Sequence, residues 1–505
     1  MFAFRCLCFA LTFFVASSAY ADLVVNTIAD EDTNNASCSL REAITAVNTQ
    51  ANYNGCADGD AIPTWSKITF AIPPNAGEVQ TIALASALPS IGRPVFIDAT
   101  TQSGASCTPV PNVRVQINFP PGADGLALGA GSDGSRIHGL ALTGAVGTSH
   151  SGLAILSDHA TVGCVISGMD ASATTALPNT NGIFIIGKHA TIGEATATSW
   201  FPNLLSGNSI ANIEVYFGAD DALIAGNYIG VDHTGLTPMQ TGLGISAEAA
   251  ARLHIGTGFA DGPPAHQRNV IGVVAKPSTS SVDIYLAGSS DAVIAGNYIG
   301  VGVDGHTLLP IGIGGNINVD SATNTLIGCN GLGSWDDCRN VMADPSDGTW
   351  GAMVIGVGGG STGTAIVSNF INVAADGITS LAGSSTQNEG IEAVDDVLVA
   401  RNLFRVAYGV DINLFSSSVL SNPALAGSDG APLNSTDNCF ADVTSIGVNS
   451  ANTTLAFDNW WGAANGPAPA GSGASAAAGV YTVPFLAAPS PYCGFDHIFT
   501  NGFDG

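Results

Sequence analysis

The stretch Asp221–Val231 reads DALIAGNYIGV, and Asp291–Val301 repeats it almost letter for letter as DAVIAGNYIGV. The offset between Asn227 and Asn297 is 70 residues. A run of this length does not recur by chance within one chain, so we interpret it as one structural unit built twice. The repeat predicts a repetitive architecture and not a single globular core.

The flanks of this stretch repeat with it in three series. They are an Ile-Gly pair (at Ile192, Ile255 and Ile327), an asparagine before an apolar pair (Asn203, Asn269 and Asn340), and the asparagine of the quoted stretch (Asn227, Asn297 and Asn369). Three anchors per unit predict three coils of roughly 23 residues in each unit, the length of one coil of a β-solenoid.

Short β-branched runs between Gly, Asn and Asp predict the strands and turns of these coils, as in Ile183–Ile186 and Ile213–Tyr216. The recurring asparagines are interpreted as structural. Asparagine tolerates the left-handed backbone of a sharp corner, and stacked amides hydrogen-bond along a column. We therefore expect Asn227, Asn297 and Asn369 to form a turn ladder and not a ligand site.

The first 21 residues have the features of a secretory signal peptide. Arg5 is the basic start, Leu7–Val15 is apolar, and a small-residue cleavage site ends at Ala21. The apolar run is too short to span a bilayer, and no later stretch reaches the about 18 residues required. We expect a mature chain without a transmembrane anchor, secreted or held at the outer cell surface; an uncleaved anchor is the alternative.

Acidic residues dominate the charge, with 40 Asp and Glu against 13 Lys and Arg and a net charge of −27. Nucleic acids and anionic membrane surfaces bind clustered cations, so neither is an expected partner. The 63 glycines and the low share of charged residues, 10%, indicate short strands joined by tight turns.

Two of the ten cysteines lie in the leader, which leaves an even number in the mature chain. In an exported chain this favours disulfides over metal ligation, and none of the eight has a CxxC spacing. The economical pairing is Cys38 with Cys56, Cys329 with Cys338, Cys439 with Cys493 and, by remainder, Cys107 with Cys164. Other connectivities remain open at the level of sequence.

Residues 22–66 are predicted to cap the first coil. Ser39 followed three residues later by Glu42 is a capping box, and Leu40, Ile44 and Val47 lie on one face of the predicted helix. A helix at this place covers strand edges that would otherwise template aggregation.

The run Cys38–Ala43 spells CSLREA and resembles the signature of the CSLREA family of exported bacterial surface proteins. Ile68–Pro73, Gln80–Leu84 and Val95–Asp98 are similar to its continuation, so the resemblance covers nearly the whole mature chain. It implies an all-β, right-handed parallel β-helix with an N-terminal capping helix, and an exported location. It transfers no catalytic residue, because the signature carries none.

The resulting division is a signal peptide (1–21), a cap (22–66), a parallel β-helix (67–430), a terminal coil (431–466), and a linker with a C-terminal tail (467–505). The NWWG element at Asn459–Gly462 resembles one found near the end of many parallel β-helix proteins. We interpret Trp460 and Trp461 as packing over the last coil, with a sugar platform as the alternative. The Ala/Gly/Ser/Pro-rich stretch 467–479 predicts the linker.

The sequence assembles no complete catalytic set, since the NTD and RIK motifs of pectin hydrolases are absent. The densest charge cluster lies between Glu389 and Asp411, and its weak catalytic candidates are Asp395, Asp396 and Arg401. The simpler interpretation is solvated turns and surface ion pairs.

No cofactor is expected, with calcium as the alternative. Asp232 and Asp304 follow the NYIG repeats and suit calcium, although aspartate is common in turns. His159 and His189 lie in matching phrases and are expected to stack at a coil corner, without a third ligand.

The sequence favours a structural or adhesive function, in which a rigid rod presents loops to a glycan or to a component of a host or cell surface. The longer excursions Glu194–Pro202, Thr257–Gln267, Asn330–Asp337 and Asp344–Thr349 should project from one side of the column, and binding is expected there. The alternative is a polysaccharide lyase or hydrolase on the same scaffold.

Overall fold

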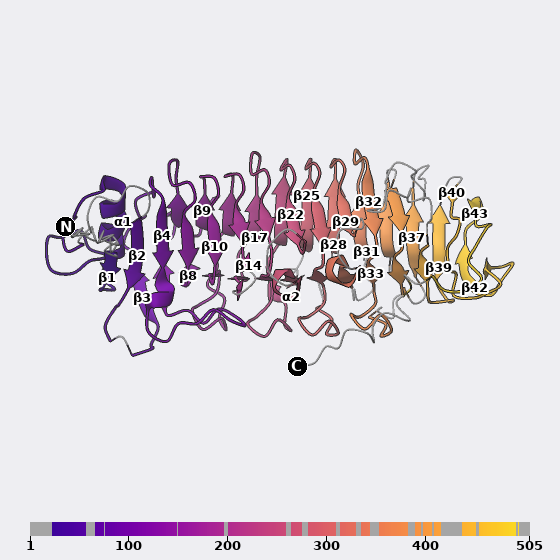
Figure 1. The fold of residues 1–505 in the computed structure, drawn as a ribbon, viewed down its shortest axis with the longest axis horizontal. Coiled ribbons are helices and arrows are strands. Elements are labelled where there is room, and N and C mark those ends of the chain that lie inside the picture. The colour runs from indigo at the N-terminus through magenta and orange to yellow at the C-terminus, as the bar shows by residue number, and fades with distance from the viewer. Residues whose placement is uncertain are drawn as a thin grey trace, which may run out of the picture.

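The chain winds repeatedly about one axis, and the strands of successive coils stack in parallel along one elongated column (Figure 1). The computed structural model describes residues 23–56, 66–74, 76–148, 150–195, 200–258, 264–274, 281–309, 314–329, 335–343, 353–381, 389–394, 397–406, 409–415, 437–450, 454–490 and 493. This architecture is a parallel β-helix, which confirms the predicted fold class.

Three long sheets form the sides of the column. The first sheet contains β1 (Leu23–Val25), β2 (Ser66–Phe70), β4 (Val95–Asp98), β7 (Arg136–His138), β10 (Thr161–Gly163), β13 (Thr191–Ile192), β18 (Leu223–Ile224), β22 (His254–Gly256), β26 (Val293–Ala295), β29 (Leu326–Gly328), β32 (Thr364–Val367) and β35 (Val397–Ala400).

The second sheet contains β3 (Gln80–Ala83), β5 (Val115–Asn118), β8 (Leu140–Thr143), β11 (Ile166–Ser167), β16 (Leu204–Leu205), β19 (Tyr228–Ile229), β23 (Val270–Ile271), β27 (Tyr298–Ile299), β30 (Val341–Met342), β33 (Phe370–Ile371), β36 (Leu403–Phe404) and β38 (Cys439–Phe440).

The third sheet contains β6 (Leu126–Leu128), β9 (Ser151–Ile155), β12 (Asn181–Ile185), β17 (Ala211–Val215), β21 (Leu243–Glu248), β25 (Ser281–Ala287), β28 (Gly314–Asp320), β31 (Met353–Val357), β34 (Glu389–Ala393), β37 (Val410–Leu414), β39 (Ile446–Ser450), β42 (Gly473–Ala476) and β41 (Pro467–Ala468).

Short elements lie between the sheets. They are the strand pairs β14 (Glu194–Ala195) with β15 (Trp200–Phe201), β20 (Met239–Gln240) with β24 (Val273–Val274) and β40 (Thr454–Leu455) with β43 (Val480–Tyr481), the helices α1 (Leu40–Thr49), α2 (Pro264–Gln267) and α3 (Trp335–Cys338), and the 3-10 turn η1 (Ala99–Thr101).

The coils are longer than the sequence predicts. Register partners along the first sheet run from Val162 to Ile192, Ile224, Ile255 and Ile294, which are steps of 30 to 39 residues. The unit of about 70 residues therefore contains two coils and not three of roughly 23. The prediction was wrong because alternate coils differ: one supplies both an Ile-Gly anchor and an asparagine, and the next supplies an asparagine alone.

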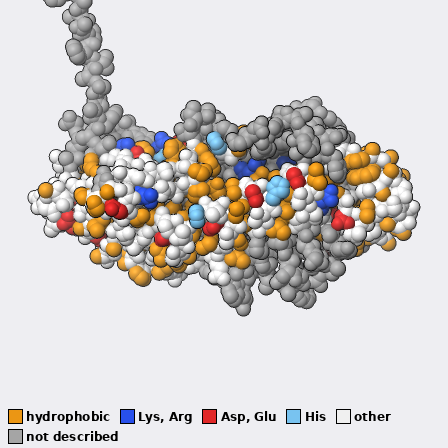
Figure 2. Space-filling model, turned by 90° about the horizontal axis from the view of Figure 1, so that it is seen from below, with side chains coloured by type: hydrophobic (Ala, Val, Ile, Leu, Met, Phe, Trp, Pro, Cys, Tyr) orange, Lys and Arg blue, Asp and Glu red, His pale blue; other side chains and the backbone are white. Residues whose placement is uncertain are grey.

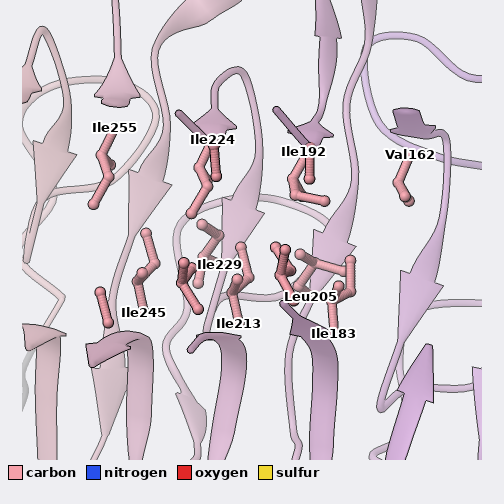
Figure 3. Close-up of a cluster of buried hydrophobic side chains, with 14 of the residues drawn as sticks. Val162, Ile183, Ile192, Leu205, Ile213, Ile224, Ile229, Ile245 and Ile255 are labelled. Carbon is pink, nitrogen blue, oxygen red and sulfur yellow. The ribbon is translucent and has the colours of Figure 1, made fainter. Parts of the chain in front are cut away.

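The core is a set of stacked aliphatic columns, one from each sheet (Figure 3). Ile224, Ile229 and Ile245 come from the three strands of one coil, and each is fully buried. Their counterparts in the neighbouring coils are also aliphatic, because the strand period of two points every second residue inward. Each such side chain contributes about 1.5–3 kcal/mol through burial, so the column is stabilised along its whole length.

A continuous ladder of buried asparagines runs along the corner between the first and second sheets. The side-chain Nδ2 of each donates to the Oδ1 of the next at 2.9–3.2 Å, through Asn203, Asn227, Asn269, Asn297, Asn340, Asn369, Asn402, Asn438 and Asn459. Asn227, Asn297 and Asn369 are therefore buried members of this ladder. The ladder satisfies polar groups that are sealed from water.

The left-handed corner residue is not the asparagine, as the sequence analysis assumed, but the residue before it. Gly226 and Gly296 have φ of 74° and 70°, and Arg401 before Asn402 has φ of 60°. Because the asparagine amide is held in the ladder, the residue before it adopts the left-handed backbone of the corner.

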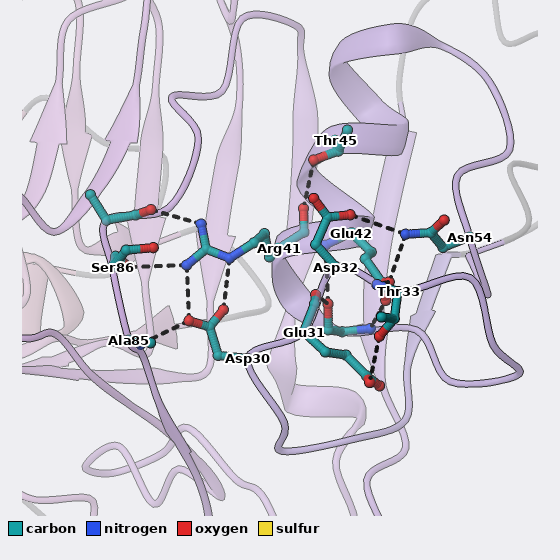
Figure 4. Close-up of polar contacts among 12 residues, drawn as sticks. Asp30, Glu31, Asp32, Thr33, Arg41, Glu42, Thr45, Asn54, Ala85 and Ser86 are labelled. Carbon is teal, nitrogen blue, oxygen red and sulfur yellow. Dashed lines mark hydrogen bonds and ion pairs between the residues drawn. The ribbon is translucent and has the colours of Figure 1, made fainter.

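Each residue of the CSLREA run has a structural role in the N-terminal cap, and Figure 4 shows the contacts of Arg41 and Glu42. Cys38 is bonded to Cys56, and Ser39 and Glu42 form the predicted capping box. Leu40 and Ala43 are buried in the core. Arg41 holds the cap to the following coil, because it pairs with Asp30 at 2.8 Å and donates to the carbonyl oxygens of residues 86 and 87.

The C-terminal end is closed by packing and a disulfide. Trp461 is fully buried against Phe440, with ring centroids 4.8 Å apart, so its indole is not a sugar platform. The stretch 467–479 is not the linker that its composition predicts, because β41 and β42 extend the third sheet. Small residues suit this close-packed end as well as they suit a linker. The tail beyond Cys493 lies outside the described residues.

The four disulfides follow the economical pairing. They join Cys38 to Cys56, Cys107 to Cys164, Cys329 to Cys338 and Cys439 to Cys493. Disulfides of this number mark a protein that folds outside the reducing cytoplasm.

Candidate functional site

A cavity of about 610 Å³ opens on the outer face of the second sheet. It is lined by Trp200, Tyr228, Ala265, Arg268, Val270, Tyr298, Val303, Asp304, His306, Ala375 and Asp376. These residues span more than 170 positions of sequence, and the stacking of successive coils brings them together.

The floor of the cavity is a row of outward-facing side chains. Tyr228, Val270 and Tyr298 are direct register partners on β19, β23 and β27. The next residue of each strand is an isoleucine in the core, so the pleat of the sheet turns the tyrosines outward. Burial raises the pKa of Tyr228, which therefore stays a neutral phenol across physiological pH.

The first wall is built from insertions between the first and second sheets. Trp200, on the hairpin β14–β15, stacks on His266 of α2 with centroids 5.1 Å apart and ring planes 4° from parallel. Its Nε1 donates to the carbonyl oxygen of Gly226 at 3.1 Å. The insertions of two successive insertion-bearing coils thus support each other.

These insertions are the excursions that the sequence analysis assigned to one side. Those at 194–202, 257–267 and 330–337 fall between strands of the first and second sheets, and β14 and α2 follow one another along the column (Figure 1). The excursion at 344–349 lies outside the described residues.

Arg268 is the cation of the cavity. Its guanidinium carbon lies 4.4 Å from the ring centroid of Tyr298. Nη1 donates to the Tyr298 hydroxyl at 3.1 Å, and Nε donates to the carbonyl oxygen of Gly296 at 3.0 Å. A guanidinium has five N–H donors, so these contacts fix its orientation and leave donors for a ligand.

The second wall consists of two equivalent turns after β27 and β33. In each, one aspartate accepts hydrogen bonds from its own turn: Asp304 from the backbone N–H groups of His306 and Thr307, and Asp376 from those of Ile378 and Thr379. Despite partial burial, these donors lower the pKa of Asp304 and lower that of Asp376 to about 2. Both carboxylates are therefore ionised at neutral pH and hydrogen-bonded within their own turns.

His306 joins the two turns of this wall. Its Nε2 lies 3.4 Å from Oδ2 of Asp376, and its Nδ1 lies 2.8 Å from the carbonyl oxygen of Asp304. The hydrogen bond to the Asp304 backbone and the charge of Asp376 raise the pKa of His306. The imidazolium therefore persists to a higher pH than in an isolated histidine, and it adds positive charge at the rim.

Figure 2 shows one face of the molecule with its side chains coloured by type. Lys and Arg, His, and Asp and Glu side chains lie near its middle among hydrophobic ones, although the whole chain is strongly acidic.

The structure describes only part of the charge cluster predicted between Glu389 and Asp411. Asp395 and Asp396 lie outside the described residues, and Arg401 occupies the left-handed corner before Asn402. Asp411 is fully buried, and desolvation raises its pKa well above the usual range.

Glu389 and Glu392 do lie together, on the outer face of the third sheet. Burial, together with the nearby Glu392 carboxylate, raises the pKa of Glu389 to about 7. The Nδ2 of Asn413 donates to Oε1 of Glu389 at 3.0 Å, and the other oxygen is buried without a partner among the described residues.

This pair predicts a pH-dependent stability. The folded-state pKa of Glu389 exceeds its ordinary value of 4.5, so its contribution is fully present below pH 4.5 and is lost as pH rises through about 7. Glu389→Gln should raise the free energy of unfolding by about 1 kcal/mol at pH 8 and change it little at pH 4.5. Thermal unfolding at both pH values measures this; an equal effect at both would contradict the prediction. Glu31→Gln, at a partly exposed glutamate, is the control.

The residues considered as metal ligands make other contacts in the structure. His159 and His189 stack as expected, with centroids 4.6 Å apart and planes 7° from parallel. Asp232 accepts hydrogen bonds from the backbone of its own turn, as Asp304 does. Within the described ranges, no three His, Cys, Asp or Glu side chains are grouped to hold a metal ion.

The cavity residues were largely missed at the level of sequence. Signals that could have found them are the tyrosines of the repeated stretch, Tyr228 and Tyr298, and the Arg-Asn pair at Arg268-Asn269, which recurs at Arg339-Asn340. None of the helices in the described part of the chain has the length and apolar character to cross a membrane.

Comparison with known proteins adds little. No family model and no curated protein matches the sequence. Among solved structures, the chain is similar to the A-module of the mannuronan C-5 epimerase AlgE6 of Azotobacter vinelandii, with 10% identity, a TM-score of 0.38, and coverage of 91% of this chain and 99% of that one. A likeness of this size carries no argument about substrate or reaction.

Proposed function

We propose that this chain is an exported β-helix protein of the CSLREA type that binds glycans through the cavity on its second sheet. The observation that carries the proposal is the cavity itself, in which a row of tyrosines forms the floor and loops from several coils form two walls. The rod then serves to present this site at the bacterial surface.

The composition of the lining supports a sugar ligand. Binding sites for small ligands are mainly apolar, with a few polar groups that fix orientation. Tyr228, Tyr298 and Trp200 supply flat apolar surface, and Arg268 and His306 supply directional donors. Pyranose rings present both apolar C–H faces and hydroxyl groups, so they suit such a lining.

The rigidity of the column supports an extracellular role. Four disulfides, the cap held by Arg41 and the buried asparagine ladder make the described column rigid. A preorganised site loses little conformational entropy on binding.

The test is a glycan array followed by titration calorimetry with the sugars that bind. Ala265 is exposed on α2 and lines the cavity, so Ala265→Trp should fill it and weaken binding by about tenfold or more. Ala29→Trp, at an exposed alanine of the cap, is the matched control. Full binding by Ala265→Trp, or no binder on the array, would defeat the proposal.

A polysaccharide lyase is the second candidate, favoured by the contact between the Tyr298 hydroxyl and Arg268 at 3.1 Å. Elimination from a uronate needs a cation to neutralise the carboxylate and a base to remove the neighbouring proton. Tyr298 and Arg268 supply that pair. Absorbance of unsaturated uronates should then rise with the parent protein and not with Tyr298→Phe; a flat trace with the parent ends this candidate.

A further inference from the structure

The hairpin β14–β15, which carries Trp200 of the first wall, stands apart from the three long sheets. In the described part of the chain its strands pair with each other, Glu194 with Phe201 and Ala195 with Trp200. A two-stranded hairpin is marginally stable by itself in water. Its side-chain contacts with the column therefore help to fix its place.

Glu194 joins the hairpin to the outer face of the first sheet. Its Oε1 accepts from Nη2 of Arg136 at 2.5 Å, and its Oε2 lies 2.9 Å from Nε2 of His138. Despite desolvation by burial, the hydrogen bonds from His138 and Arg136 lower the pKa of Glu194. The carboxylate is therefore ionised at neutral pH, and since a carboxylate only accepts, Nε2 of His138 is the donor.

His138 also holds the second strand of the hairpin. Its buried ring contacts Phe201 and Phe96, with centroids 5.0 Å and 5.1 Å away. Gly163 is the register partner of His138, and a Cβ at this glycine would lie 2.8 Å from the Cβ of Phe201. The missing side chain thus makes room for Phe201. Because Glu194 and Phe201 are cross-strand partners, both strands of the hairpin rest on one histidine.

Trp200 lies on the opposite face of the hairpin, because successive side chains of a strand alternate. There it lines the cavity, stacks on His266 and donates to the Gly226 carbonyl oxygen. A wall that is already ordered before the ligand arrives costs less conformational entropy on binding. The contacts of Glu194 on one face of the hairpin thus bear on the wall that the other face supplies.

We infer that Glu194 is a positioning residue of the binding site: by joining the hairpin to Arg136 and His138, it holds the indole of Trp200 in the cavity wall. This deepens the proposed function and rests on it. Glu194 does not line the cavity, so it acts through Trp200 and not through contact with the sugar.

The first measurement needs no sugar. Fluorine NMR of the full mature chain labelled with 5-fluorotryptophan reports the surroundings of each indole, and Trp200→Phe assigns the resonance of Trp200. Glu194→Ala should shift and broaden this resonance, because the released indole samples more than one position. The resonance of Trp461, which is fully buried at the end of the column, should stay unchanged.

Two further variants refine this measurement. Glu194→Gln keeps the size of the side chain and removes its charge, so the Trp200 resonance should change in the same direction and by less. Arg252→Gln is the control, since it breaks an ion pair with Asp221 elsewhere on the column. It should leave the Trp200 resonance as in the parent.

The second measurement is calorimetry with a sugar that binds on the array. Glu194→Ala should weaken binding about fivefold and Trp200→Ala about tenfold. The double variant should bind like Trp200→Ala alone, because Glu194 has no effect once the indole that it holds is gone. A residue that only supports the fold would give losses that add.

Three results would overturn the inference. They are an unchanged Trp200 resonance in Glu194→Ala, parent-like binding by Trp200→Ala, and losses that add in the double variant. If Ala265→Trp blocks binding and Glu194→Ala binds like the parent, the proposed function stands and this inference fails. If no sugar binds, the proposed function fails, and the Trp200 resonance still decides whether Glu194 positions the indole.

Discussion

Asn297→Ala is expected to lower the free energy of unfolding by about 3 kcal/mol. Asn297 is fully buried, accepts from Asn269 Nδ2 at 2.9 Å, and donates to the Ile255 carbonyl oxygen at 2.9 Å and to Asn340 Oδ1 at 3.1 Å. Alanine would leave these groups without partners in a dry corner, and each such group costs about 1–3 kcal/mol. Denaturant and thermal unfolding midpoints measure the loss.

Asn449→Ala is the control for this variant. Asn449 lies on the outer side of the third sheet and donates one hydrogen bond, to Oδ1 of Asn413 at 2.9 Å. Its loss should cost about 1 kcal/mol or less, because water replaces the partner. If both alanine variants lost the same stability, the ladder would not be the special element of the fold.

Glu42→Ala is expected to destabilise the cap by about 3 kcal/mol. The carboxylate is fully buried and accepts from the backbone N–H groups of Ser39 at 2.9 Å and Thr33 at 3.0 Å, and from Asn54 Nδ2 at 2.9 Å. It also lies in the first turn of α1, where negative charge is favoured. Alanine removes the capping box and leaves these hydrogen-bond donors without their acceptor.

Hydrogen exchange is the measurement, because it separates local opening from global unfolding. Exchange of Glu42→Ala should accelerate over residues 23–56 and remain unchanged in the central coils. Glu31→Ala is the control, since Glu31 is partly exposed and its carboxylate accepts from the exposed side chains of Thr33 and Asn35. Faster exchange throughout the column would refute a cap that opens by itself.

Much of the fold is predictable from local chemistry. The capping box at Ser39 and Glu42, the recurring asparagines and the local disulfides depend on residues close in sequence or repeated at a fixed interval. The coil length is not predictable in the same way. Ile255 and Asn269 belong to one coil because α2 separates their strands, and a count of anchors does not show that an insertion lies between them.

The site is harder to predict than the fold. Trp200, Arg268 and Asp376 line one cavity because five stacked coils present their lining residues on the same side of the column. The sequence analysis predicted binding at the insertions, which form the first wall. It gave Asp304 only a turn or calcium role and did not single out Asp376, since aspartates in turns suggest local capping. That capping is real, and the turns that it shapes also enclose the cavity.

The most direct test of the account is a crystal structure of the mature chain with an oligosaccharide that binds on the glycan array. The account predicts sugar density along the second sheet, between the insertion that contains Ala265 and the turn that contains Asp376, and in contact with Arg268. Density at another place, such as the terminal coil beside Trp460, with this cavity occupied by water alone, would contradict it.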